Sequence, residues 1–180
     1  LVFGGSGQIG RPVLHGLARA GWTVDAVSRH AQPDIEGVLW HAGGFDAMPV
    51  LADTYDAIIS CGPLDRFARW LHDAPVRAPR VVAFGSTSVE VKHASADAQE
   101  RDLAARLATG EAGVFAAGAR MQAAATLLRP TLVYGSGRDA TLSRIAALAR
   151  RTGFAVLPRG AHGLRMPVHV DDLARAALDC

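Results

Sequence analysis

The first ten residues constrain the fold of this chain more than any other stretch. A short apolar run at 1–3 (LVF) leads directly into a turn rich in glycine, and a helical pattern follows from about residue 8 to residue 20. Apolar side chains recur on one face of that pattern, and Gly21 ends it. A strand that turns through glycines into a helix is typical of the opening βαβ unit of a parallel sheet.

The glycine spacing indicates what such a turn could hold. Gly5, Gly7 and Gly10 fit G-x-G-x-x-G, and Gly4 with the same last two glycines fits G-x-x-G-x-x-G. Glycines allow positive φ and close approach of a pyrophosphate, whose charge the helix N-terminus favours. A glycine-rich turn without a ligand is the alternative. The context between strand and helix favours a bound dinucleotide.

The rest of the chain alternates between strand-like and helix-like patterns. Strands are expected at 23–28, 37–41, 56–60, 80–86, 126–135 and, more briefly, 154–158; helices are expected at 64–73, 97–120, 139–151 and 170–178. Pro130 places the 126–135 strand at an edge or bends it. Such alternation predicts an α/β fold: a Rossmann-like, doubly wound parallel sheet with helices on both faces, in a single domain over 1–180.

Composition excludes several other classes. With 180 residues, 49% of them hydrophobic, and a net charge of +2, the chain is an ordinary globular protein in composition. Its arginines are scattered and not interleaved with aromatic residues, so no nucleic-acid partner is expected. No apolar run approaches the roughly 18 residues of a membrane span, so no membrane association is expected. Cys61 and Cys180 lie far apart, which argues against a metal site and fits the cytoplasm.

The end of the second expected strand bears on the choice of dinucleotide. NAD-binding domains usually place an acidic residue there, about 20 residues beyond the glycines, to bind the ribose 2′-hydroxyl. Asp25 has that spacing but falls in the middle of the strand, which ends in Ser28, Arg29 and His30. A guanidinium suits a 2′-phosphate better than a free hydroxyl. NADP is therefore the expected cofactor, with NAD as the alternative, and Arg29 could also be a solvated surface residue.

Five stretches in order along the chain resemble one enzyme family: FGGSGQIG (3–10), DAIISCGP (56–63), VVAFGSTSV (81–89), LLRPTLVYGSGRD (127–139) and RMPVHVDDLA (165–174). The family is the NAD-dependent epimerase/dehydratase group, in the extended and atypical branch of the short-chain dehydrogenase/reductase superfamily. The stretches cover nearly the whole chain. The resemblance implies an NAD(P)-binding Rossmann domain that lacks most of the family's small C-terminal substrate-binding region.

The resemblance also implies roles for individual residues, which lie at the ends of the expected strands. These are Gly4, Gly7, Gln8, Ile9 and Gly10 at the pyrophosphate; Ser28 and Arg29 at the adenosine ribose; Cys61, Gly62 and Pro63 along the cofactor's ribose region; Ser86 and Thr87 facing the nicotinamide; Arg129, Pro130 and Thr131 on the nicotinamide side; and Arg165 and His169 toward a substrate pocket.

Two departures from the family pattern bear on function. The family commonly has Asp and an apolar residue near the adenine, where this chain has the segment 41–44 (HAGG). The family's Tyr-x-x-x-Lys motif, in which Lys and the cofactor lower the Tyr pKa for acid/base work, falls on Leu103 and Leu107. Neither leucine can transfer a proton, and no Tyr or Lys elsewhere in the chain has the required spacing. The standard relay is therefore absent, or rebuilt from other groups.

Three residues are the candidates for a rebuilt relay: Thr87, Ser88 and Lys92. Thr87 occupies the position of the family's catalytic hydroxyl, and Lys92 lies just downstream. Glu90, Glu111 and His93 could also move protons, but Glu111 is expected to be an exposed helix carboxylate and His93 a loop residue. Asp171 and Asp172 are expected to cap the last helix.

The sequence thus leaves two function classes open. The first is an NAD(P)-dependent oxidoreductase or epimerase acting on a small carbonyl, hydroxyl or sugar-nucleotide substrate. The second is a dinucleotide-binding protein without turnover, which would serve as a redox sensor or as an assembly or scaffold protein. The resemblance further suggests a homodimer through helices of the 97–118 and 139–151 regions.

Overall fold

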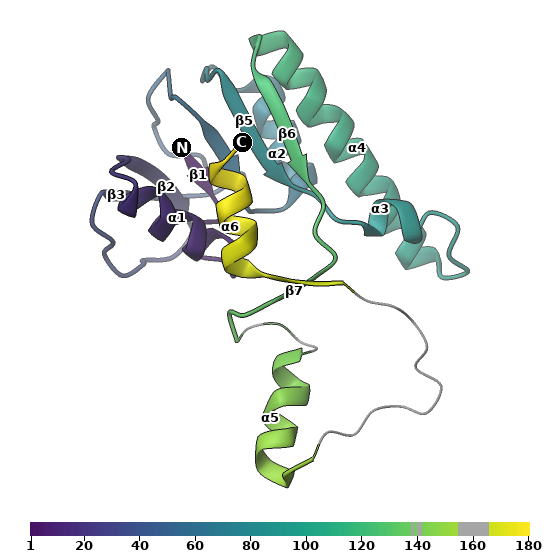
Figure 1. Ribbon diagram of the computed structural model, residues 1–180. Helices are drawn as coiled ribbons and strands as arrows, with labels where there is room; N and C mark the ends of the chain where they lie inside the picture. The colour runs from purple at the N-terminus through teal and green to yellow at the C-terminus, as the bar shows by residue number, and fades with distance from the viewer. Residues whose placement is uncertain (138, 140–141, 155–165) are drawn as a thin grey trace.

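A six-stranded parallel sheet forms the centre of the molecule (Figure 1). The computed structural model describes residues 1–137, 139, 142–154 and 166–180. The strand order is β3-β2-β1-β4-β5-β6, so the order reverses between β1 and β4. The strands are β1 (Val2–Phe3), β2 (Val24–Ser28), β3 (Val38–Ala42), β4 (Ile58–Ser60), β5 (Arg80–Phe84) and β6 (Ala124–Leu128). This order confirms the predicted Rossmann-like, doubly wound sheet.

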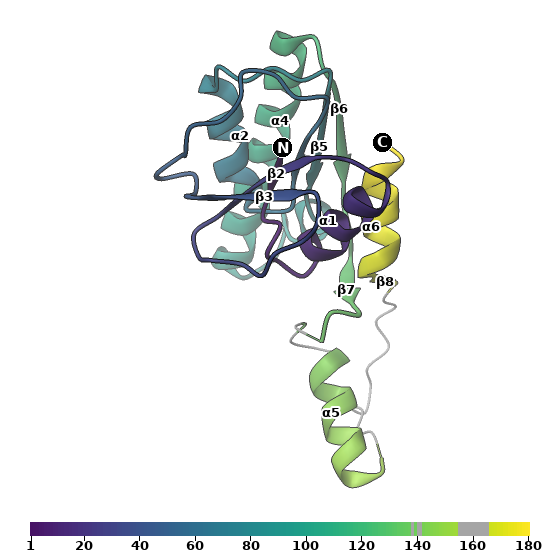
Figure 2. The same ribbon diagram turned by 90° about the vertical axis from the view of Figure 1, so that its left-hand side faces the viewer.

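Helices cover both faces of the sheet, as Figure 2 shows from the side. One face packs against α2 (Leu64–Asp73) and α4 (Ala98–Met121), and the other against α1 (Gly10–Arg19) and α6 (Val170–Leu178). The strands supply buried residues to both layers because successive side chains point to opposite faces. The short helix α3 (Ser88–Val91) follows β5. No helix in the described ranges is long and apolar enough to cross a membrane.

Four aromatic rings fill the α2 side of the core beside the glycine turn. Phe3 lies 5.1 Å from Phe45, 5.8 Å from Phe67 and 4.5 Å from Trp70, measured between ring centroids. Phe67 is fully buried on α2. Because Phe3 is the residue immediately before Gly4, this aromatic cluster fixes the point at which the glycine turn begins.

The sheet ends earlier than the sequence predicted, because the expected strand 126–135 is divided at Pro130. Its first part is β6, and its second part, β7 (Leu132–Tyr134), pairs in parallel with β8 (Pro167–His169) in a separate two-stranded sheet. Proline has no backbone N–H to continue a ladder. The chain then enters α5 (Leu142–Thr152), which projects away from the main sheet (Figures 1 and 2). Most of the strand expected at 154–158 lies outside the described residues, as does Arg165.

Among the helices, α4 agrees with expectation and the cap of α6 differs from it. The α4 helix runs unbroken through its glycines, and at Gly110 an added Cβ would lie 3.1 Å from Leu64 Cγ, so glycine lets α4 approach α2 closely. At α6 the cap is His169, whose Nδ1 accepts a hydrogen bond from the backbone N–H of Asp171, 3.2 Å away. Asp171 and Asp172 lie in the first turn, where their charge still favours the helix dipole.

Candidate functional site

The turn between β1 and α1 has a geometry that only glycine can adopt at two positions. Gly4 has φ +71°, and a Cβ there would lie 2.6 Å from the backbone carbon of Cys61. A Cβ on Gly10 would lie 2.1 Å from the Gly4 carbonyl oxygen. The turn therefore folds tightly on itself and against the end of β4, and it exposes backbone where a side chain would otherwise stand.

The N-terminus of α1 suits an anion. No side chain caps this helix and its first turn has no acidic residue, although it does contain Arg11. Helix N-termini present backbone N–H donors and a partial positive charge. The glycine turn and this helix end together form a surface that fits a pyrophosphate.

The second group of predicted cofactor residues follows β4, at the point where the strand order reverses. Pro63 is the N-cap residue of α2, and Cys61 contacts the glycine turn through its backbone. Ligands of doubly wound folds bind outside the carboxyl ends of the strands at this point. Burial raises the pKa of the Cys61 thiol to about 12, so it stays protonated at neutral pH and is not a nucleophile.

The turn after β2 forms a polar network that joins it to α1. The Ser28 hydroxyl donates to the His30 carbonyl, 2.8 Å away, and accepts from the Gln32 amide at 3.3 Å. The amide oxygen of Gln32, Oε1, accepts a hydrogen bond from Arg11 Nη2 at 3.1 Å. Arg11 was missed by the sequence reasoning, and its signal would have been a cation directly after the last glycine. Ser28 thus shapes the turn, while Arg11 and Arg29 supply its positive charge.

A second polar cluster links β2, β3 and the segment before β4. One carboxylate oxygen of Asp25 lies 2.9 Å from His41 Nε2, and the other accepts from the Tyr55 hydroxyl at 2.7 Å. Asp25 therefore points into the structure, as its position within the strand predicted. The His41 imidazole is thus engaged by Asp25 of the neighbouring strand.

This cluster makes stability depend on pH. Partial burial alone would raise the pKa of Asp25, but hydrogen bonds from His41 and Tyr55 lower it below its ordinary value. A carboxyl with a lowered folded pKa stabilises the fold above its unfolded pKa of about 3.9 and loses that contribution as pH falls through the folded value. In urea titrations from pH 7 to pH 3, we expect wild type to exceed Asp25→Asn in stability, by a margin that closes below about pH 4. A margin independent of pH would contradict this assignment.

The predicted nicotinamide side lies after β5, where three hydroxyl-bearing residues follow one another. Thr87 is the N-cap residue of α3, and its backbone N–H contacts the Pro130 carbonyl at 3.4 Å. The Ser86 hydroxyl donates to that of Ser88 at 3.1 Å. The structure thus brings the segments 86–88 and 129–131 together. The Thr131 hydroxyl donates a hydrogen bond to the backbone carbonyl of Met166, the residue before β8.

Arg129 and Glu111 form an ion pair, contrary to the exposed position expected for Glu111. Glu111 is 5% exposed, and Arg129 Nε donates to its Oε1 at 2.8 Å while Nη2 contacts the other oxygen. Arg129 Nη1 donates to Glu90 at 2.7 Å. Gly85 leaves room for the buried carboxylate, since a Cβ there would lie 2.7 Å from Glu111 Oε1. Arg129 therefore joins α3, α4 and the end of β6.

Lys92 is also engaged by a carboxylate. Its Nζ lies 2.8 Å from Glu100 Oε1, and Ser95 donates to the other oxygen at 2.7 Å. Hydrogen bonds from Lys92 and Ser95 lower the pKa of Glu100, which favours its carboxylate form. Leu107, at the expected Lys position, packs against the core on the α2 side. Apolar side chains thus occupy the positions on α4 where the resemblance predicts the family's relay.

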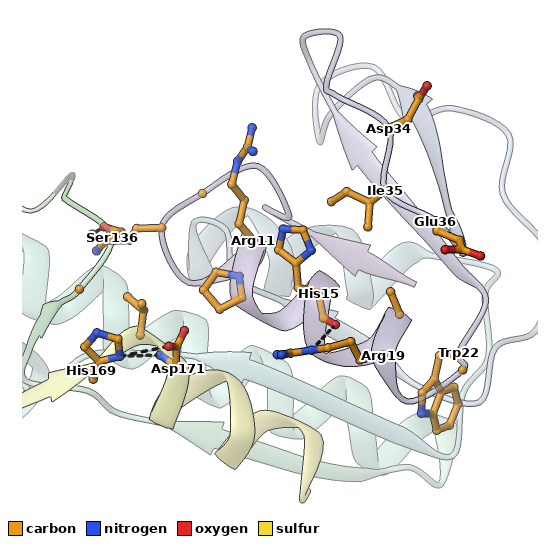
Figure 3. Close-up of a pocket in the computed structure, with 18 of the residues that line it drawn as sticks. Arg11, His15, Arg19, Trp22, Asp34, Ile35, Glu36, Ser136, His169 and Asp171 are labelled. Atoms are coloured by element: carbon orange, nitrogen blue, oxygen red, sulfur yellow. Dashed lines mark hydrogen bonds and ion pairs between the residues drawn. The ribbon is translucent and has the colours of Figure 1, made fainter.

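A cavity of about 1150 Å³ lies along the outer face of α1 (Figure 3). Arg11, His15 and Arg19 follow the helix, with Asp34 and Glu36 on one side of the groove and, on the other, Ser136 after β7 and His169 and Asp171 at the start of α6. Its lining includes Gly7 and Gln8 from the predicted pyrophosphate site but neither Ser86 nor Thr87. This groove therefore adjoins the predicted pyrophosphate site and extends to His169, which the resemblance places toward a substrate pocket.

Comparison with known proteins identifies similar folds and no sequence relatives. No protein-family model matches the chain, and no curated protein matches it. A solved structure of MoeE5 in complex with UDP-glucuronic acid and NAD matches with a TM-score of 0.74 and 21% identity, covering 98% of this chain and 70% of that one.

Two further solved structures give the same result. UDP-N-acetylglucosamine 4-epimerase from Bacillus cereus matches with a TM-score of 0.72 and 14% identity, over 98% of this chain and 71% of that one. The Bordetella bronchiseptica enzyme WbmF in complex with NAD⁺ matches with a TM-score of 0.71 and 19% identity, over 99% and 68%. The chain therefore has the fold of NAD-dependent epimerase and dehydratase enzymes over nearly its whole length, at low sequence identity.

Proposed function

We propose that this chain binds NAD(P) across the carboxyl ends of β1, β2 and β4. The observation that carries the proposal is the glycine turn, in which Gly4 and Gly10 leave no space for a Cβ and α1 begins without a side-chain cap. Solved structures with this fold contain NAD, which supports the same conclusion. Calorimetric titration with NADPH and NADH tests it, and the absence of heat with both coenzymes would overturn it.

We further propose that NADP is the preferred form. Arg29 stands directly after β2, and Arg11 joins the same turn through Gln32. Two guanidinium groups beside one turn favour a phosphate over a neutral hydroxyl, and residues 28–32 of the turn include no carboxylate to bind a ribose hydroxyl pair.

Arg29→Ala tests this preference. We expect NADPH binding to weaken about 10- to 100-fold, because that is the usual loss in affinity when a charged hydrogen-bond partner is removed. NADH binding should be unchanged. Arg77→Ala is the matched control, because this exposed arginine precedes β5 at the opposite end of the sheet. Equal losses for both coenzymes, or no loss, would contradict an NADP preference.

The proposed reaction class is oxidoreduction or epimerisation of a small carbonyl, hydroxyl or sugar-nucleotide substrate. The bound nicotinamide would supply or accept the hydride. Thr87 and Ser88 would orient the substrate oxygen by hydrogen bonds, and Lys92 is the nearest cation in sequence that could move a proton once released from Glu100. Solved structures of this fold include a UDP-N-acetylglucosamine 4-epimerase and a complex with UDP-glucuronic acid, which favours sugar nucleotides as the first substrates to test.

The second candidate function is coenzyme binding without turnover, as a redox sensor or scaffold. Leu103 and Leu107 favour it, because they replace the proton-transferring pair with side chains that cannot ionise. A panel of sugar nucleotides, ketones and aldehydes separates the two functions. Turnover, followed by NADPH absorbance and by sugar analysis for internally recycled coenzyme, supports the enzyme. Coenzyme binding without turnover supports the sensor, as would a partner whose affinity differs between NADP and NADPH.

A further inference from the structure

The segment 43–47, which follows β3, forms a tight turn tied to the end of β2. The Gly43 N–H donates to the Ser28 carbonyl at 2.9 Å, and Gly44 and Ala47 exchange a pair of backbone hydrogen bonds of 3.0 Å. Phe45, between them, is anchored in the aromatic cluster by stacking on Phe3. The turn is therefore held both by the sheet and by the core. Its contact with the sheet is at Ser28, the residue before Arg29.

The Arg29 side chain lies along this turn. A Cβ built on Gly44 would be 3.1 Å from Arg29 Cγ and 3.5 Å from Cδ. These distances mean that the methylene groups of Arg29 pack over the Gly44 backbone, leaving the guanidinium at the end of a supported stem. A supported arginine loses less conformational entropy when it binds a ligand than a freely solvated one.

The charge of Arg29 is uncompensated within the part of the chain that the structure describes. No ion pair or hydrogen bond involves its guanidinium there, whereas Arg66, Arg106 and Arg129 each contact a carboxylate. An arginine held in place without a counter-ion is suited to an external anion. Gly44 belongs to the segment 41–44 (HAGG), where the resemblance implies an Asp and an apolar residue near the adenine.

We infer that Gly44 is a specificity-determining position, which selects NADP over NAD by holding the stem of Arg29 against the 43–47 turn. The inference rests on the proposed binding of NAD(P) and adds to it the origin of the coenzyme choice. Gly44 touches no reacting atom and acts through Arg29. Because residue 44 has no side chain, the methylene groups of Arg29 can pack on its backbone, and the guanidinium is held where it would bind the 2′-phosphate.

The test is a cycle of Gly44 and Arg29 variants, each titrated with NADPH and NADH. Gly44 does not have a positive φ, so Gly44→Ala introduces only the crowding against Arg29. We expect NADPH affinity to fall roughly 3- to 10-fold, as for a side chain forced off its rotamer, and further in Gly44→Val, with NADH affinity unchanged. In the Arg29→Ala background, the Gly44 substitutions should have no additional effect on either coenzyme.

Two outcomes would overturn the inference. One is an equal loss of NADPH and NADH affinity, which would mean that residue 44 borders the adenine directly. The other is a full additional loss in the Arg29→Ala background, which would mean that the two positions act independently. Wild-type titration distinguishes these from failure of the proposed function, since a chain that does not bind dinucleotides gives no heat with either coenzyme before any substitution is made. Thermal melting of each variant confirms that the fold is retained.

Discussion

Gly10→Ala is expected to weaken the binding of both NADPH and NADH by roughly 100-fold or more, because the helix N-terminus would no longer approach the pyrophosphate. The added Cβ would lie 2.1 Å from the Gly4 carbonyl oxygen and 2.6 Å from Gly5 Cα. Both are backbone atoms, so the contact can be relieved only by opening the turn. Calorimetric titration of both coenzymes measures the loss.

Gly16→Ala provides the matched control, since it makes the same substitution in the same helix. Its Cβ would meet the end of the Leu178 side chain at 2.9 Å, and that end can rotate away. We expect Gly16→Ala to bind both coenzymes as wild type does. If Gly10→Ala also bound them normally while remaining folded, the glycine turn would not be the pyrophosphate site.

The second large effect is expected in the aromatic cluster behind the same turn. Phe67→Ala removes a ring that is fully buried and contacts Phe3, Phe45 and Trp70. Truncation of a buried Phe costs about 3–5 kcal/mol, which in a chain of this size lowers Tm by about 6–20 °C. Calorimetric melting measures the change. Coenzyme affinity should fall as well, because Phe3 and Phe45 position the glycine turn and the 43–47 turn.

Phe115→Ala tests whether that loss is specific to the cluster. Phe115 is 47% exposed on α4, and we expect its truncation to shift Tm by no more than a few degrees. Similar losses for Phe67→Ala and Phe115→Ala would show that the cluster does not dominate stability on the α2 side of the sheet.

Features set by local sequence could be predicted, and features set by distant partners could not. The strand–helix alternation and the glycine spacing predicted the parallel sheet and the place of the turn, because both depend on neighbours in the chain. The helix at 64–73 was predicted to the residue. Pro130 was recognised as a disturbance, but the pairing of β7 with β8 depends on residues more than thirty positions later.

Glu111 shows why parts of the site escaped prediction. A single carboxylate in an alanine-rich helix is normally solvated. Its burial here depends on the missing side chain of Gly85 and on the guanidinium of Arg129, which follow two different strands, β5 and β6. The Asp25–His41–Tyr55 cluster is similar, since only the register of β2 with β3 brings Asp25 beside His41. Such groups can be recognised from the sequence only once the strand pairing is known.

The parallel pairing of β7 with β8 has a consequence for how this fold can vary. Three paired residues on each strand fasten the start and the end of the segment between Tyr134 and Pro167 to each other, beside the predicted nicotinamide end. With both ends fastened, the entropic free-energy cost of closing the intervening chain rises only slowly with its length, by about 0.6 kcal/mol for each doubling. Changes of length beyond Ser136, whose hydroxyl contacts Gln8 of the glycine turn at 3.3 Å, would leave the pairing of β7 with β8 in place. The pair thus divides the chain into the part that forms the main sheet and a connecting segment whose length can change at small entropic cost.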